Sequence, residues 1–346
     1  MSPWRMCPRY DARIMRAAVL HAPRDLRFDP AAPDPAAAPG EVLVRVARAG
    51  LCGSDLHVYR TGDFITAFPV TPGHEVVGTV VAVGAGADAP LVGARVVLDS
   101  RVPCGACAWC ALGVFQRCPA IGFLGEVRDG GFAEFVTVPA ARVWRLPDAL
   151  AFDVAVLAEP TAVVLHAIAR AQRVAERPMT RAAVLGAGPV GVLLALALPP
   201  ETEVVLVEPT PARASTARHI TGRPVVTPDA EAALAGVFDT VFDCAGAFGS
   251  LGRAAALAVP GGVVTAVALH HKPDELDVNA FVGREVTVTG THVFADEMPA
   301  ALALLAANPA RFAPVVDRVA TLEEVPSLVA VAAAGQAEHL KLAIAP

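Results

Sequence analysis

Residues 182–198 read AAVLGAGPVGVLLALAL, an apolar strand, a glycine turn and an apolar helix in direct succession. The turn has the spacing G-x-G-x-x-G, and its residues are Gly186, Gly188, Pro189, Val190 and Gly191. In this spacing the first glycine permits a tight turn, the second lets the backbone approach a pyrophosphate, and the third allows close helix packing. The stretch predicts a dinucleotide-binding site, and a glycine turn in an α/β domain without a nucleotide is the alternative.

The strand at 182–185 is the first of several apolar segments that alternate with helical stretches. The further predicted strands are residues 204–207, 240–243, 263–268 and 286–289, and a helical stretch over residues 161–174 precedes them. Alternation of this kind indicates a parallel sheet that is covered by helices on both faces. The second half of the chain is therefore predicted to be a doubly wound α/β domain.

A carboxylate stands at the end of the second predicted strand. Glu208 follows the glycine turn by about twenty residues, where an acid accepts hydrogen bonds from the ribose hydroxyls of a dinucleotide. Its negative charge repels a 2′-phosphate, so the sequence favours NAD over NADP. Arg213 could serve a 2′-phosphate, but Glu208 opposes it at close range, and NADP stays an open alternative.

The chain before residue 160 has a different pattern, in which short β segments are broken by Gly and Pro. The predicted strands are residues 41–47, 76–83, 95–98 and 132–138. They indicate an irregular, barrel-like β domain, and a length of 346 residues agrees with two domains. A helix over residues 298–307 leads to a strand-like segment at 340–344, and we expect this tail to return to the first domain.

Four cysteines lie within fifteen residues in the spacing C-x2-C-x2-C-x7-C, and they are Cys104, Cys107, Cys110 and Cys118. Four thiolates can surround one tetrahedral ion with no open position, which is typical of structural zinc. An iron-sulfur cluster is the alternative because Cys118 precedes a proline, but the bacterial ferredoxin run has three residues before its last cysteine. This chain has seven there, so the spacing favours zinc.

A second set of metal-ligating side chains lies upstream. Cys52 stands in the segment LCGSDLH, residues 51–57, and His74 and Glu75 follow as a dipeptide. Cys, His and carboxylate ligands are typical of a catalytic zinc ion that keeps one position open for water or substrate. Glu159, which begins the predicted helix before the α/β domain, is a further carboxylate candidate. The sequence does not decide which of Glu75 and Glu159 binds directly.

These motifs match, in order and spacing, those of a known superfamily. CGSDLH, GHE, the four cysteines and GAGPVG together resemble the zinc-dependent medium-chain dehydrogenase/reductase (alcohol dehydrogenase) superfamily, from Met15 to Pro346. Glu159 stands where many alcohol dehydrogenases have a cysteine ligand, and in this the chain is similar to the sorbitol, threonine and 2,3-butanediol dehydrogenase branch. The resemblance implies a homodimer or homotetramer. It also implies a GroES-like catalytic barrel domain (residues 15–159 and 296–346) and a Rossmann NAD-binding domain (residues 160–295), with residues 1–14 predicted to be a disordered extension.

The resemblance implies a zinc-dependent oxidoreductase that transfers a hydride between a secondary alcohol and NAD, with one catalytic and one structural zinc ion per chain. Zinc makes an alcohol a far stronger acid, so a proton must leave the site. Ser54 is expected to accept this proton and to pass it towards His57 and solvent. Asp55 is expected to orient the ring of His74. Taken singly, Ser54 reads as a turn residue, His57 as a surface histidine and Asp55 as a helix cap.

Spacing does not identify the substrate. Polyols, vicinal diols or acyloins, and amino alcohols all stay open, and His292 and Tyr59 are candidates to line the pocket. Two other classes of function are kept. A zinc-free quinone or enoyl reductase of the same superfamily lacks the cysteine lobe and the GHE ligands. A catalytically silent dinucleotide-binding or redox-sensing protein has no need of an open metal site.

Composition excludes several partners. Asp plus Glu number 34 against 28 for Lys plus Arg, and without a basic stripe the sequence argues against nucleic acid as a partner. The resemblance implies a small alcohol or ketone as the partner. Residues 182–200 are long enough for a transmembrane helix, but six of these nineteen residues are Gly or Pro, so no membrane span is expected. Seven cysteines, four of them at metal spacing, agree with a reducing cytoplasm.

Overall fold

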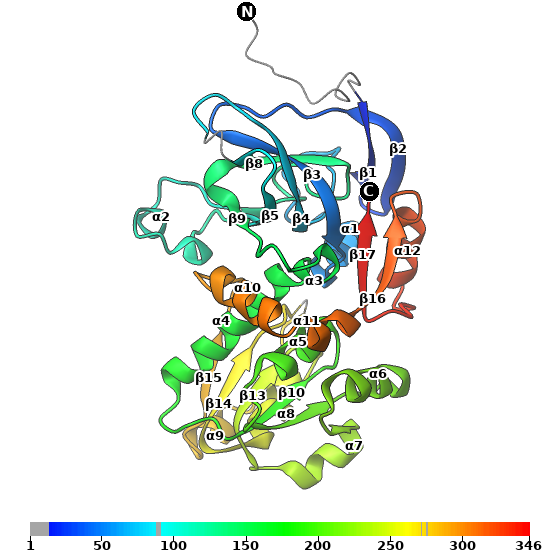
Figure 1. The fold of residues 1–346 in the computed structure, drawn as a ribbon. Helices are drawn as coiled ribbons and strands as arrows, with labels where there is room; N and C mark the ends of the chain where they lie inside the picture. Colours follow the sequence, from blue (N-terminus) through cyan, green and yellow to red (C-terminus); the bar gives the residue numbers. More distant parts are fainter. Residues whose placement is uncertain (1–13, 88–90, 271, 275) are drawn as a thin grey trace, which may run out of the picture. The chain divides into compact units, whose positions relative to one another are not determined.

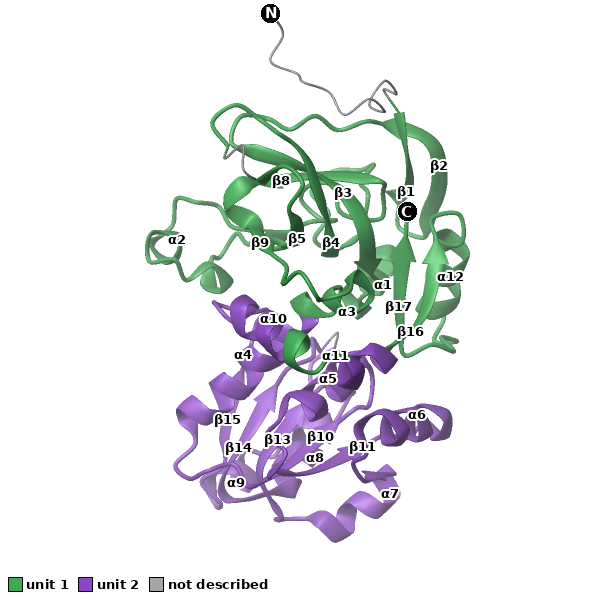
Figure 2. Ribbon diagram, in the orientation of Figure 1, with its two compact units in different colours: residues 1–159, 305–309, 316–346 green, residues 160–304, 310–315 purple. Residues whose placement is uncertain are grey.

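The computed structural model describes residues 14–87, 91–270, 272–274 and 276–346. The extension predicted for residues 1–14 lies outside these ranges except for Ile14, which begins the first strand. The chain forms two compact units, which Figure 2 colours separately. Unit 1 comprises Met1–Glu159, Leu305–Pro309 and Val316–Pro346, and unit 2 comprises Pro160–Leu304 and Ala310–Val315.

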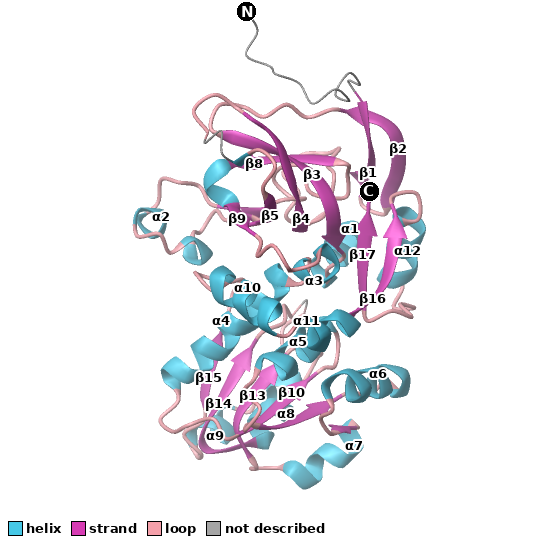
Figure 3. Ribbon diagram, in the orientation of Figure 1, coloured by secondary structure: helices cyan, strands magenta, loops and turns pink. Residues whose placement is uncertain are grey.

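Unit 1 consists mainly of β-strands (Figure 3). Its larger sheet has the strand order β16-β17-β3-β4-β5-β9, and β8 pairs with β3. Val42, Val44 and Val46 alternate along β3 and are all buried in one core, as the two-residue period of a strand requires. The strands are β1 (Ile14–Ala22), β2 (Asp25–Pro33), β3 (Glu41–Gly50), β4 (Glu75–Val83), β5 (Arg95–Leu98), β6 (Arg101–Val102), β7 (Gly122–Phe123), β8 (Phe135–Pro139), β9 (Val143–Arg145), β16 (Val316–Thr321) and β17 (Lys341–Ala345).

The C-terminal tail completes this sheet. Strand β17 pairs antiparallel with β3, so that Ala343 lies opposite Gly50 and Ile344 opposite Ala49. The predicted return of the tail to the first domain is therefore confirmed, and together with the β-rich sheet it gives the GroES-like fold that the motifs indicate. The helices of unit 1 are α1 (Gly53–Thr61), α2 (Ala108–Ala111), α3 (Phe152–Ala155) and α12 (Val325–Ala333).

Unit 2 is built on six parallel strands in the order β12-β11-β10-β13-β14-β15 (Figure 1). The strand order reverses between β10 and β13, and in such sheets the carboxyl ends of the strands at this point form a ligand-binding crevice. The predicted Rossmann fold is confirmed. The strands are β10 (Arg181–Leu185), β11 (Glu203–Val207), β12 (Val225–Val226), β13 (Phe238–Asp243), β14 (Ala258–Ala266) and β15 (Thr287–Gly290).

Helices α5 (Pro189–Ala197), α6 (Pro211–Thr221) and α8 (Ser250–Leu257) contact these strands. The other helices with most of their residues in unit 2 are α4 (Ala158–Val174), α7 (Pro228–Glu231), α9 (Val278–Val282), α10 (Met298–Ala307) and α11 (Pro309–Phe312). Helix α5 starts with Pro189 after the N-cap Gly188 and ends at Ala197. Only Leu198 separates its last residue from the Pro199-Pro200 pair. Six successive residues of α5, from Gly191 to Leu196, are buried, which explains why this helix is apolar all round.

Residues 182–200 thus contain strand β10, the glycine turn and helix α5, as expected for a buried stretch without a membrane span. A different stretch, Phe152–Val174, is long and apolar enough to cross a membrane by length and composition alone. It comprises helices α3 and α4, and 72% of an apolar 18-residue segment within it is buried inside the structure. Burial of this kind is what a core helix shows.

Candidate active site

Two antiparallel strands bring the upstream metal-ligating residues together in unit 1. Gly50, the last residue of β3, pairs with Glu75, the first residue of β4. Cys52 follows β3 by two residues, and His74 directly precedes β4. The ligand atoms of Cys52, His74 and Glu75 consequently all lie within 4.8 Å of one another.

Asp55 contacts two of these three residues. It is the third residue of helix α1, whose N-cap is Cys52. Its Oδ2 accepts the backbone N–H of Cys52 at 2.8 Å, and its Oδ1 lies 3.2 Å from Nδ1 of His74. Burial by itself lowers the pKa of His74, but Asp55 and Cys52 outweigh it and raise this pKa well above the usual value. With Nδ1 directed to Asp55, Nε2 of His74 is the atom that can ligate a metal.

A lysine from the C-terminal strand closes the same site. Nζ of Lys341 donates to Oε1 of Glu75 at 2.6 Å and to the carbonyl oxygen of Leu51 at 2.9 Å. Burial opposes the charge of Lys341, but Glu75 and other acidic groups raise its pKa above the usual value. Spacing rules miss this residue because 266 positions separate it from Glu75. The available signal is composition, since Lys341 and Lys272 are the only lysines in the chain.

The second carboxylate oxygen of Glu75, Oε2, occupies the space that a side chain at position 50 would fill. Oε2 is buried and lies 2.5 Å from Nζ of Lys341 in an ion pair, but it accepts no hydrogen bond from the described residues. A Cβ atom on Gly50 would collide with this oxygen. Glycine at position 50 is therefore required for Glu75 to point its carboxylate toward Cys52 and His74.

The donor set fits a zinc ion with an open coordination position. A thiol, an imidazole nitrogen and a carboxylate oxygen are the atom types that zinc takes, and three protein ligands leave a fourth position for a small molecule. The buried Oε2 of Glu75 has no hydrogen bond among the described residues and forms the ion pair with Lys341, so a metal ion at this oxygen would share it with the ammonium group. Cys52, His74 and Glu75 are therefore the residues that would hold the ion.

The other candidate carboxylate has a different set of contacts. Glu159 is buried in the first turn of α4, and its Oε1 accepts a hydrogen bond from Oγ of Ser100 at 3.3 Å. Burial raises the pKa of Glu159 to about 7, with His74 opposing and Glu75 adding to this shift. Within the described part of the chain, the three-residue ligand group contains Glu75 and does not contain Glu159. Ser100 is a second contact that spacing rules miss.

The four cysteines of the lobe gather in unit 1 as a second ligand group. The Sγ atoms of Cys107 and Cys110 are 3.5 Å apart, those of Cys104 and Cys110 are 3.9 Å apart, and all four lie within 4.8 Å of one another. Tetrahedral zinc with Zn–S bonds of about 2.3 Å places its sulfurs roughly 3.8 Å apart. The residues present, Cys104, Cys107, Cys110 and Cys118, therefore fit a structural zinc ion.

Electrostatics at this lobe also favour a bound cation. Backbone N–H groups of Ala106 and Cys107 lower the pKa of Cys104 to about 6, whereas desolvation and the neighbouring thiols raise the pKa of Cys110 to about 12. The pKa shifts are opposite because backbone N–H groups favour the thiolate of Cys104, whereas Cys110 is desolvated and hydrogen-bonded to neighbouring sulfurs in its thiol form. A divalent cation would allow all four sulfurs to be charged together.

The lobe is attached to the sheet by a buried charge cluster. Arg101 donates to both carboxylate oxygens of Asp99 at 2.8 Å, and Arg142 donates to Oδ2 of Asp99 at 2.9 Å. Burial opposes ionisation, but the two guanidinium groups hold the pKa of Asp99 below its usual value. Both guanidinium groups also lie over the ring of Phe115. The distance from Cζ to the ring centroid is 5.8 Å for Arg101 and 4.2 Å for Arg142.

Ser54 and His57, the predicted proton-carrying residues, both lie on helix α1. Ser54 is half-buried in the first turn of the helix, beside Asp55. Nε2 of His57 lies 3.0 Å from Oδ2 of Asp63, a residue just beyond the helix. The two predicted residues thus belong to the helix whose N-cap is Cys52, and their roles in proton transfer stay predictions.

The glycine turn of unit 2 has the geometry that the motif requires. Gly186 has φ +90°, and a Cβ there would approach Ala245 at 3.1 Å. A Cβ on Gly191 would collide with the carbonyl oxygen of Gly186, which explains the third glycine. A Cβ on Gly188 would have no neighbour within 4 Å, so the N-terminus of α5 faces open space where a phosphate group can approach.

Glu208 lies beside this turn at the carboxyl end of β11. Its Oε2 accepts the backbone N–H of Ala187 at 3.0 Å, and its Oε1 accepts that of Thr210 at 2.9 Å. Arg213 on α6 places Nη1 3.6 Å from Oε1 of Glu208. The structure therefore brings together Glu208, predicted to bind the ribose hydroxyls, and Arg213, the candidate for a 2′-phosphate, as one ion pair next to Gly186.

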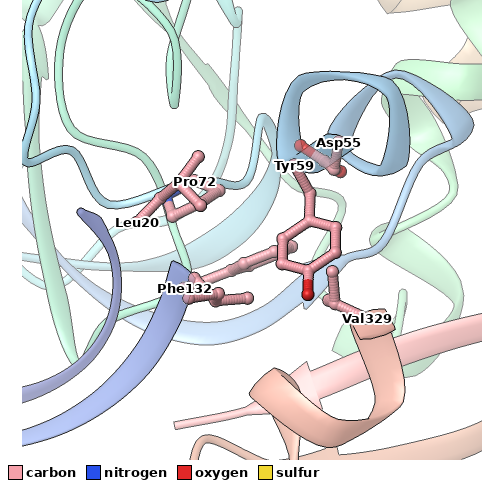
Figure 4. A pocket seen from close by; sticks show the side chains of 7 residues that line it. Leu20, Asp55, Tyr59, Pro72, Phe132 and Val329 are labelled. Atoms are coloured by element: carbon pink, nitrogen blue, oxygen red, sulfur yellow. The ribbon is translucent and has the colours of Figure 1, made fainter. Parts of the chain in front are cut away.

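A small cavity of about 10 Å³ lies in unit 1 (Figure 4). Asp55 and Tyr59 border it from helix α1, yet the exposed surface within it is apolar, and its size is at the limit for one water molecule. It is therefore a packing defect and not a substrate pocket. The seven lining residues are Leu20, Leu26, Asp55, Tyr59, Pro72, Phe132 and Val329.

Comparisons with known proteins agree with this fold and indicate a zinc-dependent family. A family model for the alcohol dehydrogenase GroES-like domain matches residues 38–148, and one for zinc-binding dehydrogenase matches residues 188–307. Sorbitol dehydrogenase of Bacillus subtilis (strain 168) is 30% identical over 309 residues, which cover 85% of this chain and 86% of that protein.

Two solved structures extend the comparison to the whole fold. The crystal structure of 2R,3R-butanediol dehydrogenase from Bacillus subtilis has a TM-score of 0.85 and 30% identity, and the match covers 96% of this chain and 99% of that one. A zinc-binding dehydrogenase from Sinorhizobium meliloti 1021, bound to NADP, has a TM-score of 0.85 and 27% identity over the same shares. The fold and the two ligand groups define a zinc-type dehydrogenase. The chain belongs to the zinc-type alcohol dehydrogenase family of medium-chain dehydrogenases/reductases.

Proposed function

We propose that the protein is a zinc-dependent oxidoreductase that transfers a hydride between a secondary alcohol and NAD. The observation that carries the proposal is the cluster of Cys52, His74 and Glu75, which has the donor atoms of a catalytic zinc site and an open position. The glycine turn of unit 2 supports a dinucleotide as the hydride acceptor.

The chain's own residues have separate tasks in this reaction. A zinc ion, when bound, would supply Lewis acidity that makes the hydroxyl group of the substrate a stronger acid. Asp55 keeps the ring of His74 in the orientation that exposes Nε2. Ser54 takes the hydroxyl proton by hydrogen bond and His57 carries it towards solvent. Lys341 balances the charge of Glu75 within the buried site.

We propose NAD as the preferred cofactor. The carboxylate of Glu208 stands next to the turn, where it can accept hydrogen bonds from ribose hydroxyls and repel a 2′-phosphate. The ion pair with Arg213 weakens this repulsion, and one related structure has NADP bound. The ratio of kcat/KM for the two cofactors tests this point, and Glu208→Ala is expected to raise the relative use of NADP.

The substrate class is proposed from the relatives and from the open metal site. Related proteins are named for sorbitol and for butanediol, which are a polyol and a vicinal diol. A secondary alcohol of this kind, or an amino alcohol, is the proposed substrate. We further propose two zinc ions per chain, a homodimer or homotetramer, and a reducing cytoplasm as the compartment, because thiols at both metal sites must stay reduced.

The test is a screen of NAD reduction over polyols, vicinal diols, threonine and simple secondary alcohols, made with the wild type and two cysteine variants. Cys52→Ser is expected to abolish turnover, to remove one zinc ion per chain and to leave NAD binding intact. Cys244→Ser is the control for metal content, because Cys244 belongs to neither ligand group. Turnover by Cys52→Ser would favour a zinc-free reductase, and an inactive wild type that binds NAD would favour the silent binding protein.

A further inference from the structure

The end of helix α1 carries an acidic contact to His57. Nε2 of His57 lies 3.0 Å from Oδ2 of Asp63, and Oγ1 of Thr61 lies 3.5 Å from the same nitrogen. We propose that Asp63 is the positioning residue for His57: it accepts the Nε2–H group and so fixes the tautomer in which Nδ1 holds the lone pair that takes up a proton. This inference rests on the proposed alcohol oxidation, for which His57 carries the proton.

The chain builds this contact with the C-terminal turn of α1. Gly62 adopts the left-handed conformation with φ +76°, and its N–H bonds the carbonyl oxygen of Val58, so the chain reverses direction directly after the helix. Oγ1 of Thr61 donates to the carbonyl oxygen of His57 at 3.0 Å and accepts the backbone N–H of Asp63 at 3.1 Å. The backbone position of Asp63 is therefore determined by the helix that carries His57.

The next residue shows that this turn is held under strain. Phe64 has φ +71°, a left-handed conformation that is sterically unfavourable for a bulky side chain and persists only where the surroundings impose it. Its ring lies against that of His57, with the centroids 5.8 Å apart. Phe64 itself is largely exposed. Burial of the Phe64 side chain therefore does not explain its strained backbone conformation. The contact between its ring and that of His57 does.

The difference in exposure between His57 and Asp63 gives a proton a path from the half-buried ring to solvent. The side chain of His57 is 12% exposed, whereas that of Asp63 is 59% exposed. A proton that reaches Nδ1 of His57 forms an N–H bond there, while the Nε2–H bond breaks and its proton passes to Oδ2 of Asp63. The electron pair stays on Nε2, and the carboxylic acid then loses the proton to water. The ring returns to its first tautomer by exchange with solvent.

Two other polar side chains of helix α1 have partners of their own. Nη1 of Arg60 donates to the carbonyl oxygen of Ala333 on α12 at 3.3 Å, and the hydroxyl group of Tyr59 donates to the carbonyl oxygen of Arg24 at 3.3 Å. Asp63 thus places a carboxylate oxygen at Nε2 of His57.

The first test does not need turnover. In protein labelled with ¹⁵N-histidine, the His57 signals are assigned by their loss in His57→Gln. We expect the wild type to show Nε2 protonated in the neutral ring, and Asp63→Ala to show a mixture of both tautomers. Asp153→Ala is the matched control, because Asp153 is 57% exposed and pairs with Arg48 in the same unit. Equal tautomer populations in Asp63→Ala and the wild type would overturn the proposal.

The second test measures turnover. Asp63→Ala is expected to lower kcat by roughly threefold to tenfold at neutral pH, with KM changed by less than about twofold, because proton transfer and not substrate binding is affected. The loss should shrink at high pH, at high concentrations of a small buffer base, and in Asp63→Glu. A loss that is constant across pH and buffer would mean a merely structural role. If the wild type oxidises no alcohol, the proposed function fails, and the tautomer experiment still decides the role of Asp63.

Discussion

The buried pair of Lys341 and Glu75 allows a prediction with a defined size. Lys341→Met replaces the ammonium group by an apolar chain of similar length and leaves the carboxylate of Glu75 without its cation. Both side chains are almost fully buried and make contacts of 2.5 and 2.6 Å. Removing one partner of a buried pair costs about 3–5 kcal/mol, because the remaining charge is desolvated and uncompensated. This is a large part of a total stability of about 5–15 kcal/mol.

The assay is urea unfolding of the full-length protein, measured first in the presence of a metal chelator and then with zinc added. Lys341→Met should lose about 3–5 kcal/mol in the chelator and less with zinc, because a cation at Glu75 replaces the lost charge. The double variant Lys341→Met with Glu75→Gln should recover much of the loss. Lys272→Met is the control, since Lys272 is exposed and is the other lysine in the chain.

The pH dependence of this contribution follows from the raised pKa of Lys341. A lysine whose pKa is higher in the folded protein stabilises it fully below the unfolded pKa of about 10.4, and this stabilisation is lost as the pH rises through the folded pKa. The difference between Lys341→Met and the wild type should therefore be constant from pH 6 to 9. A loss no larger than that of Lys272→Met, within about 0.5 kcal/mol, would refute the reasoning.

Three further predictions concern single residues of unit 1. Gly50→Ala should displace the carboxylate of Glu75 and weaken zinc binding at the Cys52 site without changing the zinc content of the cysteine lobe, and metal analysis of the variant after dialysis decides this. Burial raises the pKa of Glu126 to about 7, with Asp55 adding and His74 opposing, so Glu126 destabilises the metal-free protein as the pH rises from about 4.5 to 7. Glu126→Gln should match the wild type in unfolding free energy at pH 4.5 and exceed it by about 1–2 kcal/mol at pH 8, after allowance for partial exposure. Phe115→Ala should loosen the cysteine lobe by removing the ring that Arg101 and Arg142 cover, which faster loss of one zinc ion to a chelator would reveal, and an unchanged rate of loss would argue against that contact.

The sequence predicts those parts of the molecule whose determinants are local. The glycine turn, the strand before it and the helix after it are adjacent in the chain, so the requirements of the backbone appear as a spacing. The four cysteines of the lobe fall within fifteen residues for the same reason. The parallel sheet follows from the alternation of apolar strands and helices, which needs no knowledge of distant contacts.

The remaining features depend on contacts between distant segments. Lys341 reaches Glu75 only because β17 pairs with β3, and no motif connects these two positions. Ser100 meets Glu159 across 59 residues, and a serine after a strand has no spacing that marks it. The contact of Asp63 with His57 is short in sequence, yet it depends on the left-handed conformation of Gly62, which a pattern of residue types shows only in part.

The central claim is that one chain holds a catalytic and a structural zinc ion in two separate groups of side chains. Zinc content per chain, measured on purified wild type and on Cys52→Ser together with alcohol-dependent NAD reduction, tests it most directly. We expect two zinc ions with turnover in the wild type, and one zinc ion without turnover in the variant. Equal zinc content in the two proteins, or alcohol oxidation by Cys52→Ser, would contradict the account.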